Sequence, residues 1–358
     1  MRGSQQKEWG QPRRSTSPTP LVSTEITLLS TYKMSGPATR LIPASSRTLL
    51  LTFDAFGTLF HPRLPVPEQY AATAHQFGLS RTAITPDKLK TAFRDTFRAQ
   101  MHQYPNYGRA DVLRGQYAGP RQWWEEVIKG SFRRVLSAEN GETHPETPKE
   151  HVPDGMVEAL LDRFAGAEGY ALYDDVLPFF HRMHKLKSAH KWSFDRIIVG
   201  VVSNSDDRVP VVLKSLGLTV GDMRADQDQS SMDLPGFEVR SIKKDVTGEH
   251  DKAHADCNLD LDIDMVITSY EAGQEKPHRL IFDVARRQAL KVARPWLTSR
   301  TKFKSVHVGD DFKKDYQGAR DAGWESYLLP RDSHGADKFE AKQFPNLLKL
   351  ADKLELFP

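Results

Sequence analysis

Four short apolar runs, each ending at a polar or glycine-containing turn, constrain the fold of this chain more than any other feature. Apolar residues follow one another in each run instead of alternating with polar ones, which is typical of strands buried on both faces of a sheet. Helical patterns separate the later runs, and this alternation favours an α/β fold with a doubly wound parallel sheet. The runs lie at 49–53, 197–202, 265–268 and 306–308, and the helical patterns lie at 209–216, 278–293 and 314–322.

The polar residues that follow these runs are predicted to meet in one crevice. In a doubly wound sheet the functional loops lie beyond the carboxyl ends of the strands, so residues far apart in the sequence come together there. We therefore expect one shared site with contributions from Asp54, Ser203, Lys276 and Asp310.

The long segment between the first two runs has the periodicity of amphipathic helices, interrupted by a turn-rich stretch at 104–108. An inserted helical domain is the simplest interpretation, and directly after a catalytic loop it would cover the crevice, exclude water and select substrates. Trp123 and Trp124 are candidates for lining this lid, although packing inside the helical domain is the commoner position for either. The expected helices cover 68–77, 86–98 and 121–136.

Composition and periodicity divide the chain into a tail, a core and an inserted cap. The tail is rich in Ser, Thr and Pro without sustained periodicity, which predicts disorder, and a similar stretch inside the core predicts a flexible insertion. The predicted regions are a disordered basic tail at 1–48, a Rossmann-type sheet core at 49–62 and 191–335 with the insertion at 219–261, a helical cap at 63–190 and a C-terminal helical segment at 336–358.

The first 48 residues carry seven basic and two acidic side chains, a bias that weakly resembles a mitochondrial transit peptide. An unstructured tail, or an upstream extension with Met34 as the true start, is the other interpretation. Cys257 is the only cysteine, which excludes an intramolecular disulfide and fits a reducing compartment. We predict a cytoplasmic protein, with a mitochondrial location as the alternative.

Charge and hydropathy narrow the class of partner. Lys and Arg number 50 against 47 Asp and Glu, and a net charge of +3 is too small and too evenly spread to indicate nucleic acid. No apolar run approaches the roughly 18 residues of a membrane-spanning helix. The prediction is a small-molecule substrate, no nucleic acid and no membrane span; no pattern predicts the oligomeric state.

An acidic stretch near residue 260 matches part of a calcium-binding motif. The first, third, fifth and twelfth positions of an EF-hand loop are occupied by Asp260, Asp262, Asp264 and Glu271. Met265 stands at the sixth position, where the sharp turn requires glycine, and the alternating apolar residues indicate the entry of a strand. We therefore reject a calcium site.

Asp54 leads the candidate catalytic segments. A carboxylate directly after a buried strand is placed for nucleophilic attack, and Gly57 permits close approach of the backbone to an anionic ligand. Ser203 and Asn204 stand at a strand-to-helix junction, where backbone N–H groups and the helix dipole favour an anion. Taken alone, each segment is equally explained as an ordinary turn or helix cap.

Two later segments add a cation and a carboxylate cluster. Lys276 offers a cation, and the following Pro277 restricts the backbone conformation at this position. The alternative is an ordinary surface lysine, which is the usual place for an isolated one. Three carboxylates at the end of another strand are harder to explain structurally, because clustered like charges lower stability unless a cation neutralises them. Their hard oxygen atoms suit Mg²⁺. These carboxylates belong to Asp310, Asp311 and Asp315.

In their order along the chain, these segments resemble the four motifs of the haloacid dehalogenase (HAD) superfamily across about residues 48–332. Within it, the stretches at 107–108, 121–124 and 308–320 are similar to the eukaryotic branch of haloacid dehalogenase-like hydrolase domain-containing proteins. The resemblance implies a Rossmann-like core with a helical cap inserted after the first strand.

For phosphatase members, the resemblance also implies that Asp54 attacks phosphorus and forms an aspartyl phosphate while Lys276 neutralises the phosphoryl oxygens. Asp311 and Asp315 would orient Lys276 or a water molecule. The implied magnesium ligands are Asp54, the backbone carbonyl of Phe56 and Asp310, and the implied phosphate-binding residues are Gly57, Thr58, Ser203 and Asn204.

Phe56 departs from the pattern of the phosphatases. These usually carry a second aspartate two residues after the nucleophile, where it protonates the leaving group and then activates water. A phenyl ring can do neither, and losing a general acid/base lowers a rate by about 10²–10⁴-fold. His61 is near enough in sequence to substitute, although an exposed loop histidine is the commoner case.

Three functions therefore fit the sequence. The first is Mg²⁺-dependent hydrolysis of a phosphorylated small molecule, which we favour. The second is a metal-independent 2-haloacid dehalogenase: halide leaves without a proton and those enzymes carry an aromatic residue where Phe56 stands, but their fourth motif reads Ser-Asn and not Gly-Asp. The third is a non-catalytic ligand-binding or scaffold member of the superfamily. The cap would choose the substrate, and its geometry is not readable from the sequence.

Overall fold

The computed structural model describes residues 47–139, 152–188, 194–225, 261–299, 301–331 and 340–355. The predicted basic tail lies almost wholly outside the described residues, as does most of the predicted insertion, with Cys257 and Asp260 in it.

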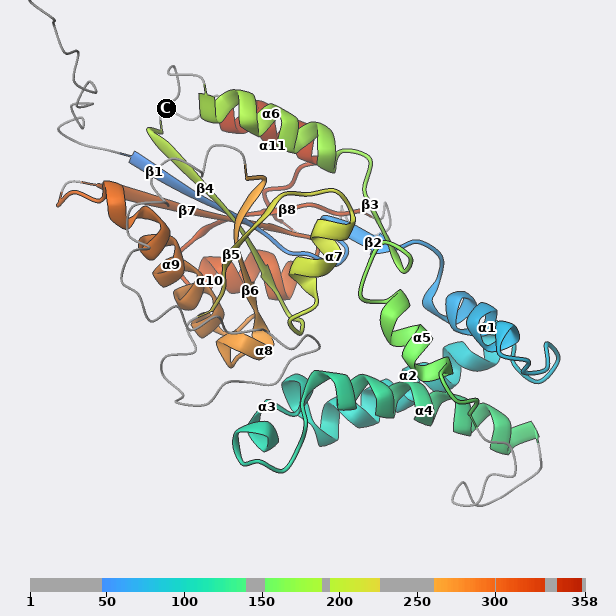
Figure 1. The fold of residues 1–358 in the computed structure, drawn as a ribbon. Coiled ribbons are helices and arrows are strands. Elements are labelled where there is room, and N and C mark those ends of the chain that lie inside the picture. Colours follow the sequence, from blue (N-terminus) through green and yellow to red (C-terminus); the bar gives the residue numbers. More distant parts are fainter. Residues whose placement is uncertain are drawn as a thin grey trace, which may run out of the picture. The chain divides into compact units, whose positions relative to one another are not determined.

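Six parallel strands form the central sheet in the order β5-β6-β4-β1-β7-β8 (Figure 1). The predicted doubly wound parallel sheet is confirmed. β1, Arg47–Phe53, lies between β4, Arg196–Ser203, and β7, Lys302–Gly309. The remaining strands of the sheet are β5, Val220–Met223, β6, Ile263–Thr268, and β8, Glu325–Leu328.

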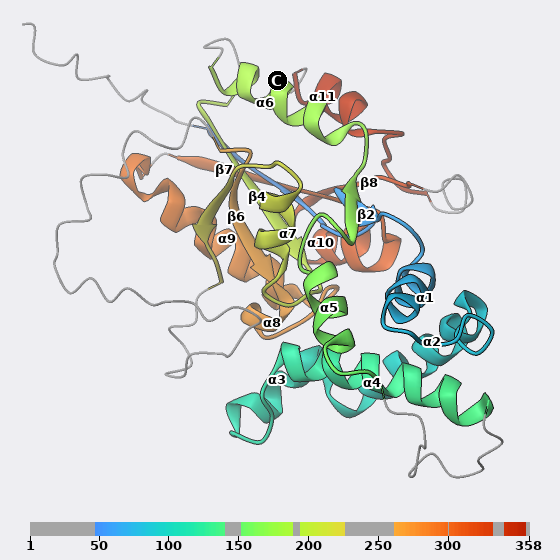
Figure 2. The ribbon, with the colours of Figure 1, turned by 45° about the vertical axis from the view of Figure 1, so that its right-hand side comes forward.

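Alternate residues of β1 are buried in two different clusters, which is why its sequence is continuously apolar. Leu49, Leu51 and Phe53 pack in the cluster that includes α6, Val176–Ser188, and α11, Leu347–Glu355. Leu50 packs in the other, with α9, Arg279–Ala293. Figure 2 shows α6 and α11 on one side of the sheet and α9 on the other. The shorter helical elements of the core are α7, Val209–Ser215, α8, Ser269–Ala272, a 3₁₀ turn at Arg294–Trp296, a π-helical turn at Phe312–Gln317 and α10, Gly318–Asp321.

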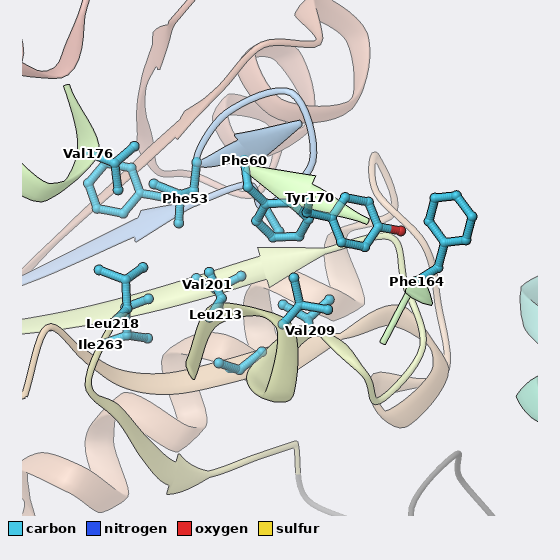
Figure 3. Packing of buried hydrophobic residues seen from close by; sticks show 14 of the residues in the cluster. Phe53, Phe60, Phe164, Tyr170, Val176, Val201, Val209, Leu213, Leu218 and Ile263 are labelled. Carbon is cyan, nitrogen blue, oxygen red and sulfur yellow. The ribbon is translucent and has the colours of Figure 1, made fainter. Parts of the chain in front are cut away.

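A two-stranded antiparallel ribbon carries the chain into and out of the helical insertion. Its strands are β2, Phe60–Pro62, and β3, Tyr170–Leu172. The rings of Phe60 and Tyr170 lie side by side in this ribbon, with centroids 5.2 Å apart (Figure 3). The helices between the two strands are α1, Val66–Gln76, α2, Pro86–Gln103, α3, Pro105–Leu113, α4, Pro120–Glu139, and α5, Met156–Arg163.

The start of α2 shows how local sequence sets a helix boundary. The Thr85 side chain accepts a hydrogen bond from the Lys88 backbone N–H, and Pro86 occupies the first helical turn, where its missing N–H is not needed. At the other end of α2, the turn-rich stretch contains three consecutive residues of left-handed backbone, at 106–108. The break predicted at 104–108 is therefore present in the cap.

Two elements differ from the sequence-based organisation. α6 falls within the range predicted as cap, 63–190, yet its Phe179 and Phe180 rings pack on Phe53 of the sheet at 5.4 and 6.2 Å. Periodicity shows that a helix has an apolar face but not which surface covers it. β5 lies inside the range predicted as a flexible insertion. The sequence did not predict this short edge strand, because it contains the exposed Asp222 and therefore lacks a continuous apolar run. The wider division into domains stays a prediction.

Asp260 lies outside the described residues, and the rest of the rejected calcium motif lies on β6 and at its ends. Residues 263–268 form the strand that the alternation predicted, and Asp264 accepts a hydrogen bond from the Val199 backbone N–H at 2.7 Å. Asp262 accepts from the backbone N–H of Thr219 at 2.7 Å. These carboxylates therefore serve sheet pairing. None of the described helices is both long enough and apolar enough to cross a membrane.

Candidate active site

Asp54 follows β1 directly, and its side chain is nearly buried. Its backbone N–H donates to the Val308 carbonyl of β7 at 2.9 Å, which ties the start of the loop to the sheet edge. Gly57 has φ +76°, and a Cβ atom there would lie 2.6 Å from a carboxylate oxygen of Asp310, so a side chain is excluded. The Thr58 hydroxyl donates to Asp310 at 3.1 Å. The loop thus presents Asp54 and holds Asp310 beside it.

The Lys276 ammonium lies between two carboxylates. Its Nζ donates to Asp54 Oδ1 at 2.6 Å, to Asp315 Oδ1 at 2.7 Å and to the Val202 carbonyl at 2.7 Å. The Asn204 amide holds the backbone of Lys276, accepting from its N–H at 2.6 Å and donating to its carbonyl at 2.9 Å. All three donor positions of the ammonium are therefore used within the site.

Carboxylate oxygens of Asp54, Asp310 and Asp315 all lie within 4.8 Å of one another. Asp315 also accepts from the Asp311 backbone N–H at 3.0 Å. Gly309 is required for this approach, because a Cβ atom there would stand 2.2 Å from the carboxyl carbon of Asp315. Asp54, Lys276 and Asp310, which were predicted to be neighbours, are thus brought together.

His307 is a buried neighbour that the sequence did not single out. Its Nε2 lies 3.2 Å from Asp315 Oδ1, and its Nδ1 lies 2.9 Å from the Thr52 hydroxyl. Burial lowers the pKa of His307 although Asp315 opposes this effect, so the ring is neutral near pH 7. The signal in the sequence was one polar residue inside the apolar run at 306–308.

The predicted phosphate-binding residues have different surroundings. The Ser203 hydroxyl, at the end of β4, makes no hydrogen bond with the described protein groups and is available to a ligand. Asn204 is engaged with Lys276, and Thr58 with Asp310. Asp311, predicted to support the site, accepts from the backbone N–H groups that begin the π-helical turn. The ligand-binding roles of these residues stay predictions.

The site holds more negative than positive charge. Burial raises the pKa of Asp54 to about 7 against the lowering effect of Lys276, and the charges of Asp315 and Asp310 add to the rise. Burial and then Asp315 likewise raise the pKa of Asp310. For Asp315, burial is outweighed by Lys276 and His307, so its pKa is lowered. Burial opposes the charge on Lys276, but Asp315 and Asp54 outweigh it and raise the pKa to about 12.

The donor set fits a divalent cation. Three carboxylates against one ammonium leave an excess of negative charge, and carboxylate oxygens are the ligands that Mg²⁺ prefers. Burial is the main cause of the raised pKa values of Asp54 and Asp310, and the neighbouring carboxylates add to both, so a bound cation would favour the ionised forms. The residues present therefore suit the metal that the motif predicted.

Residues 49–323 match the family model described as "Hydrolase: haloacid dehalogenase-like hydrolase". The chain belongs to this family. The haloacid dehalogenase-like hydrolase is 29% identical over 295 residues to "Uncharacterized protein YMR130W" of Saccharomyces cerevisiae, covering 81% of this chain and 74% of that protein. It is 29% identical over 312 residues to "Haloacid dehalogenase-like hydrolase domain-containing protein 3" of Mus musculus, covering 86% of this chain and 94% of that protein. The predicted eukaryotic branch is confirmed.

Among solved structures, the hydrolase is similar to a HAD phosphatase from Thermococcus onnurineus. The TM-score is 0.44 with 17% sequence identity, over 85% of this chain and 97% of that chain.

Phe56 places an aromatic ring two residues after Asp54, at the position where the phosphatase motif has a second aspartate. Phe56 is 37% exposed, and its ring makes edge contacts with Phe60 and Tyr170, at centroid distances of 4.6 and 5.4 Å. His61, the candidate substitute, has its Nδ1 2.9 Å from the Pro62 carbonyl. The ring of His61 also packs on Tyr173, so the structure gives it partners away from Asp54.

Arg331 links the nucleophile loop to the chain that returns from the cap, a contact that no motif predicted. Its guanidinium donates twice to the Thr58 carbonyl, at 3.1 and 2.5 Å, and Nη1 donates to both carboxylate oxygens of Asp175 at 2.9 and 2.8 Å. The pair is nearly buried. Arg331 thereby fixes the loop that carries Asp54 relative to the ribbon between core and cap.

The left-handed turn in α3 docks the cap on the core. Asn106 has φ 48° and Tyr107 has φ 61°, a conformation that L side chains rarely adopt. The Asn106 amide donates to the Ser269 carbonyl and accepts from its hydroxyl, both at 2.9 Å. Backbone strain of this kind persists only where surrounding contacts hold it.

Replacing Asn106 by Ala is expected to lower the free energy of unfolding by about 2–3 kcal/mol. Two hydrogen bonds contribute about 1 kcal/mol each, and a left-handed alanine adds roughly 1 kcal/mol of strain. Asn106→Gly is the matched control, because it loses the same bonds without the strain. Urea unfolding of both variants tests this, and equal losses in the two would contradict a strained turn.

Proposed function

We propose that this haloacid dehalogenase-like hydrolase is a Mg²⁺-dependent hydrolase of a phosphorylated small molecule, acting through an aspartyl phosphate on Asp54. The observation that carries the proposal is the bridge formed by Lys276 between Asp54 and Asp315, within a cluster of three carboxylates. A lysine fixed beside the attacking oxygen is placed to neutralise a phosphoryl group, and the carboxylates suit a divalent cation.

The proposed reaction has two steps on the same side chain. A carboxylate oxygen of Asp54 attacks phosphorus, a new O–P bond forms, and the bond to the leaving oxygen breaks with its electron pair remaining on that oxygen. Water then attacks phosphorus, releasing phosphate and restoring the carboxylate, and its proton passes to solvent or product. During both steps the Ser203 hydroxyl binds a phosphoryl oxygen and the positive charge of Lys276 neutralises the group, while Asp315 holds Lys276 in position.

Mg²⁺ would be held by Asp54, Asp310 and the backbone carbonyl of Phe56, and it would neutralise the charge that accumulates on the phosphoryl oxygens. Thr58 contributes indirectly, by donating to Asp310. Its proposed role is therefore to hold a metal ligand, in addition to the phosphate contact that the motif implies.

Phe56 supports a second candidate, a metal-independent 2-haloacid dehalogenase. There Asp54 would displace halide from carbon, and a halide ion leaves without needing the proton that Phe56 cannot supply. The carboxylate cluster weighs against this reaction, because an excess of negative charge around the nucleophile opposes binding of a haloacid carboxylate.

A direct assay separates these functions. Purified protein and Asp54→Asn are tested with a chromogenic phosphate ester, acetyl phosphate and 2-chloropropionate, each with Mg²⁺ and with chelator. Asp222→Asn is the matched control, since that carboxylate lies on edge strand β5 and is fully open to solvent. We expect phosphate release that requires Mg²⁺ and falls roughly 10³-fold or more in Asp54→Asn.

Each other outcome selects a different function. Halide release that survives chelation would establish the dehalogenase and overturn the phosphatase. Absence of Asp54-dependent release from every substrate would favour a ligand-binding member of the family. Release from acetyl phosphate alone would indicate an enzyme restricted to leaving groups that need no proton.

A further inference from the structure

A cavity of about 60 Å³ lies between the cap helices and Arg208, the residue before α7. Most of its lining is apolar and comes from α1, α2, α4 and α5. Its polar lining residues are Tyr70, Trp124, Tyr170 and Arg208. The cavity is therefore an aromatic chamber with a few polar groups, the composition typical of small-molecule sites.

Two buried tyrosines in this chamber lack protein partners. Tyr70 is 2% exposed and Tyr170 is 6% exposed, and neither hydroxyl hydrogen-bonds to any group in the described part of the chain. The rings of Tyr70 and Tyr170 both contact Phe164, each at a centroid distance of 5.7 Å, so one side chain separates them. Figure 3 shows the Tyr170 hydroxyl directed away from Phe60 and toward Phe164, another lining residue. Hydroxyls that line a cavity and have no protein partner are available to hydrogen-bond a ligand there.

The charged groups of the chamber neutralise each other. Arg208 donates from Nε and Nη2 to the two carboxylate oxygens of Asp206, at 2.9 and 2.8 Å. Burial opposes ionisation of Asp206, but Arg208 outweighs it and lowers the pKa of that carboxyl. The Trp124 indole donates to the same carboxylate at 2.8 Å. An ion pair that is already complete gives the chamber no net charge to attract an ionic group.

The chamber adjoins the proposed reaction centre through Phe56. The Tyr170 ring, which lines the cavity, packs on Phe56, two residues beyond Asp54. Arg208 stands five residues after Ser203 on the loop that leaves β4. A phosphoryl group held by Ser203 and Lys276 would therefore have its organic substituent directed past Phe56 toward the cavity.

We propose that this cavity binds the leaving group of the substrate, and that this group is a compact, uncharged alcohol with an apolar surface and one further hydroxyl or carbonyl. The inference rests on the proposed function, because it takes the phosphoryl group to lie at Asp54. A volume of about 60 Å³ is roughly twice the share of one water molecule in the liquid, which limits the enclosed part to about two groups of that size. The unpartnered tyrosine hydroxyls bind the further hydroxyl or carbonyl.

Phosphonates test the cavity without requiring turnover. Affinities of methylphosphonate, propylphosphonate and 3-hydroxypropylphosphonate for the full chain with Mg²⁺ are measured by calorimetry. All three share the anionic head group, so differences among them report the organic part. We expect 3-hydroxypropylphosphonate to bind about 10-fold or more tightly than methylphosphonate, because its chain is buried and its hydroxyl is bonded.

Three variants locate the effect. Val66→Phe fills the cavity from the partly exposed start of α1 and is expected to remove the 10-fold advantage while methylphosphonate binds as before. Tyr70→Phe with Tyr170→Phe is expected to make propylphosphonate and 3-hydroxypropylphosphonate equal in affinity. Tyr104→Phe is the control, since Tyr104 is a cap tyrosine that does not line the cavity and is expected to change nothing.

The possible failures are distinguishable. If methylphosphonate binds but the longer phosphonates gain nothing, the leaving-group cavity is wrong and the phosphatase stands. A gain that persists in Val66→Phe likewise overturns it, since the chain then lies elsewhere. If no phosphonate binds, the phosphoryl site itself is absent, and both the proposed function and this inference are overturned.

Discussion

Phe56→Asp is expected to raise kcat/KM for an aryl or alkyl phosphate by about 10²–10⁴-fold, the usual contribution of a general acid/base. The aspartate would stand two residues after Asp54, where phosphatases of the family carry one. It would protonate the departing oxygen and then accept a proton from the attacking water. Acetyl phosphate should gain little, because acetate leaves without a proton.

The structure indicates that the substitution is tolerated. Phe56 is 37% exposed, so replacing it leaves no closed cavity. Its edge contacts with Phe60 and Tyr170 contribute roughly 0.5–1.5 kcal/mol each, which sets the expected loss of stability. A fourth carboxylate near the cluster would also increase the requirement for Mg²⁺.

Phe56→Asn provides the matched control. It has the size and polarity of aspartate but cannot exchange a proton near neutral pH. The measurement is the ratio of kcat/KM for phenyl phosphate to that for acetyl phosphate in the wild-type chain and both variants. An equal rise with Asn and Asp would show that removing the ring, and not adding an acid, changes the rate.

The sheet and the central site residues were predictable from the sequence because both follow from local pattern. A strand buried on both faces must be continuously apolar, as β1 is, and parallel strands place their final residues at one edge. Asp54, Lys276 and Asp310 therefore met as expected, although more than 200 residues separate Asp54 from the other two.

The contacts that position those residues were not predictable, because they depend on side chains from distant elements. Arg331 follows the last strand without any motif, and nothing local indicates that it bonds to Thr58. Trp124 was expected either in the cap core or in the lid lining, and it does line the cavity beneath the cap, but its hydrogen bond to Asp206 of the core loop was not predictable. Pairing across the fold is set by three-dimensional packing, which periodicity does not report.

Lys276→Met is expected to lower Tm by on the order of 10 °C. Methionine keeps the unbranched shape of the lysine stem but removes the charge that lies between Asp54 and Asp315. Removing one partner of a buried ion pair typically destabilises by about 3–5 kcal/mol, and each kcal/mol lowers Tm by roughly 2–4 °C in a domain of ~150–250 residues. Lys313→Met is the control, because Lys313 belongs to the same acidic segment but is exposed, and no change is expected.

Added Mg²⁺ gives this variant its sharpest test. Without the ammonium, three carboxylates within 4.8 Å of one another have no positive charge between them, so a divalent cation there should stabilise the variant more than the wild-type chain. Thermal unfolding with and without Mg²⁺ measures the difference. Asp310→Asn in the Lys276→Met background should abolish the added stabilisation, because it removes a proposed ligand. If Mg²⁺ raises Tm equally in the wild-type and Lys276→Met chains, the cation binds elsewhere and the metal site at Asp54 is wrong.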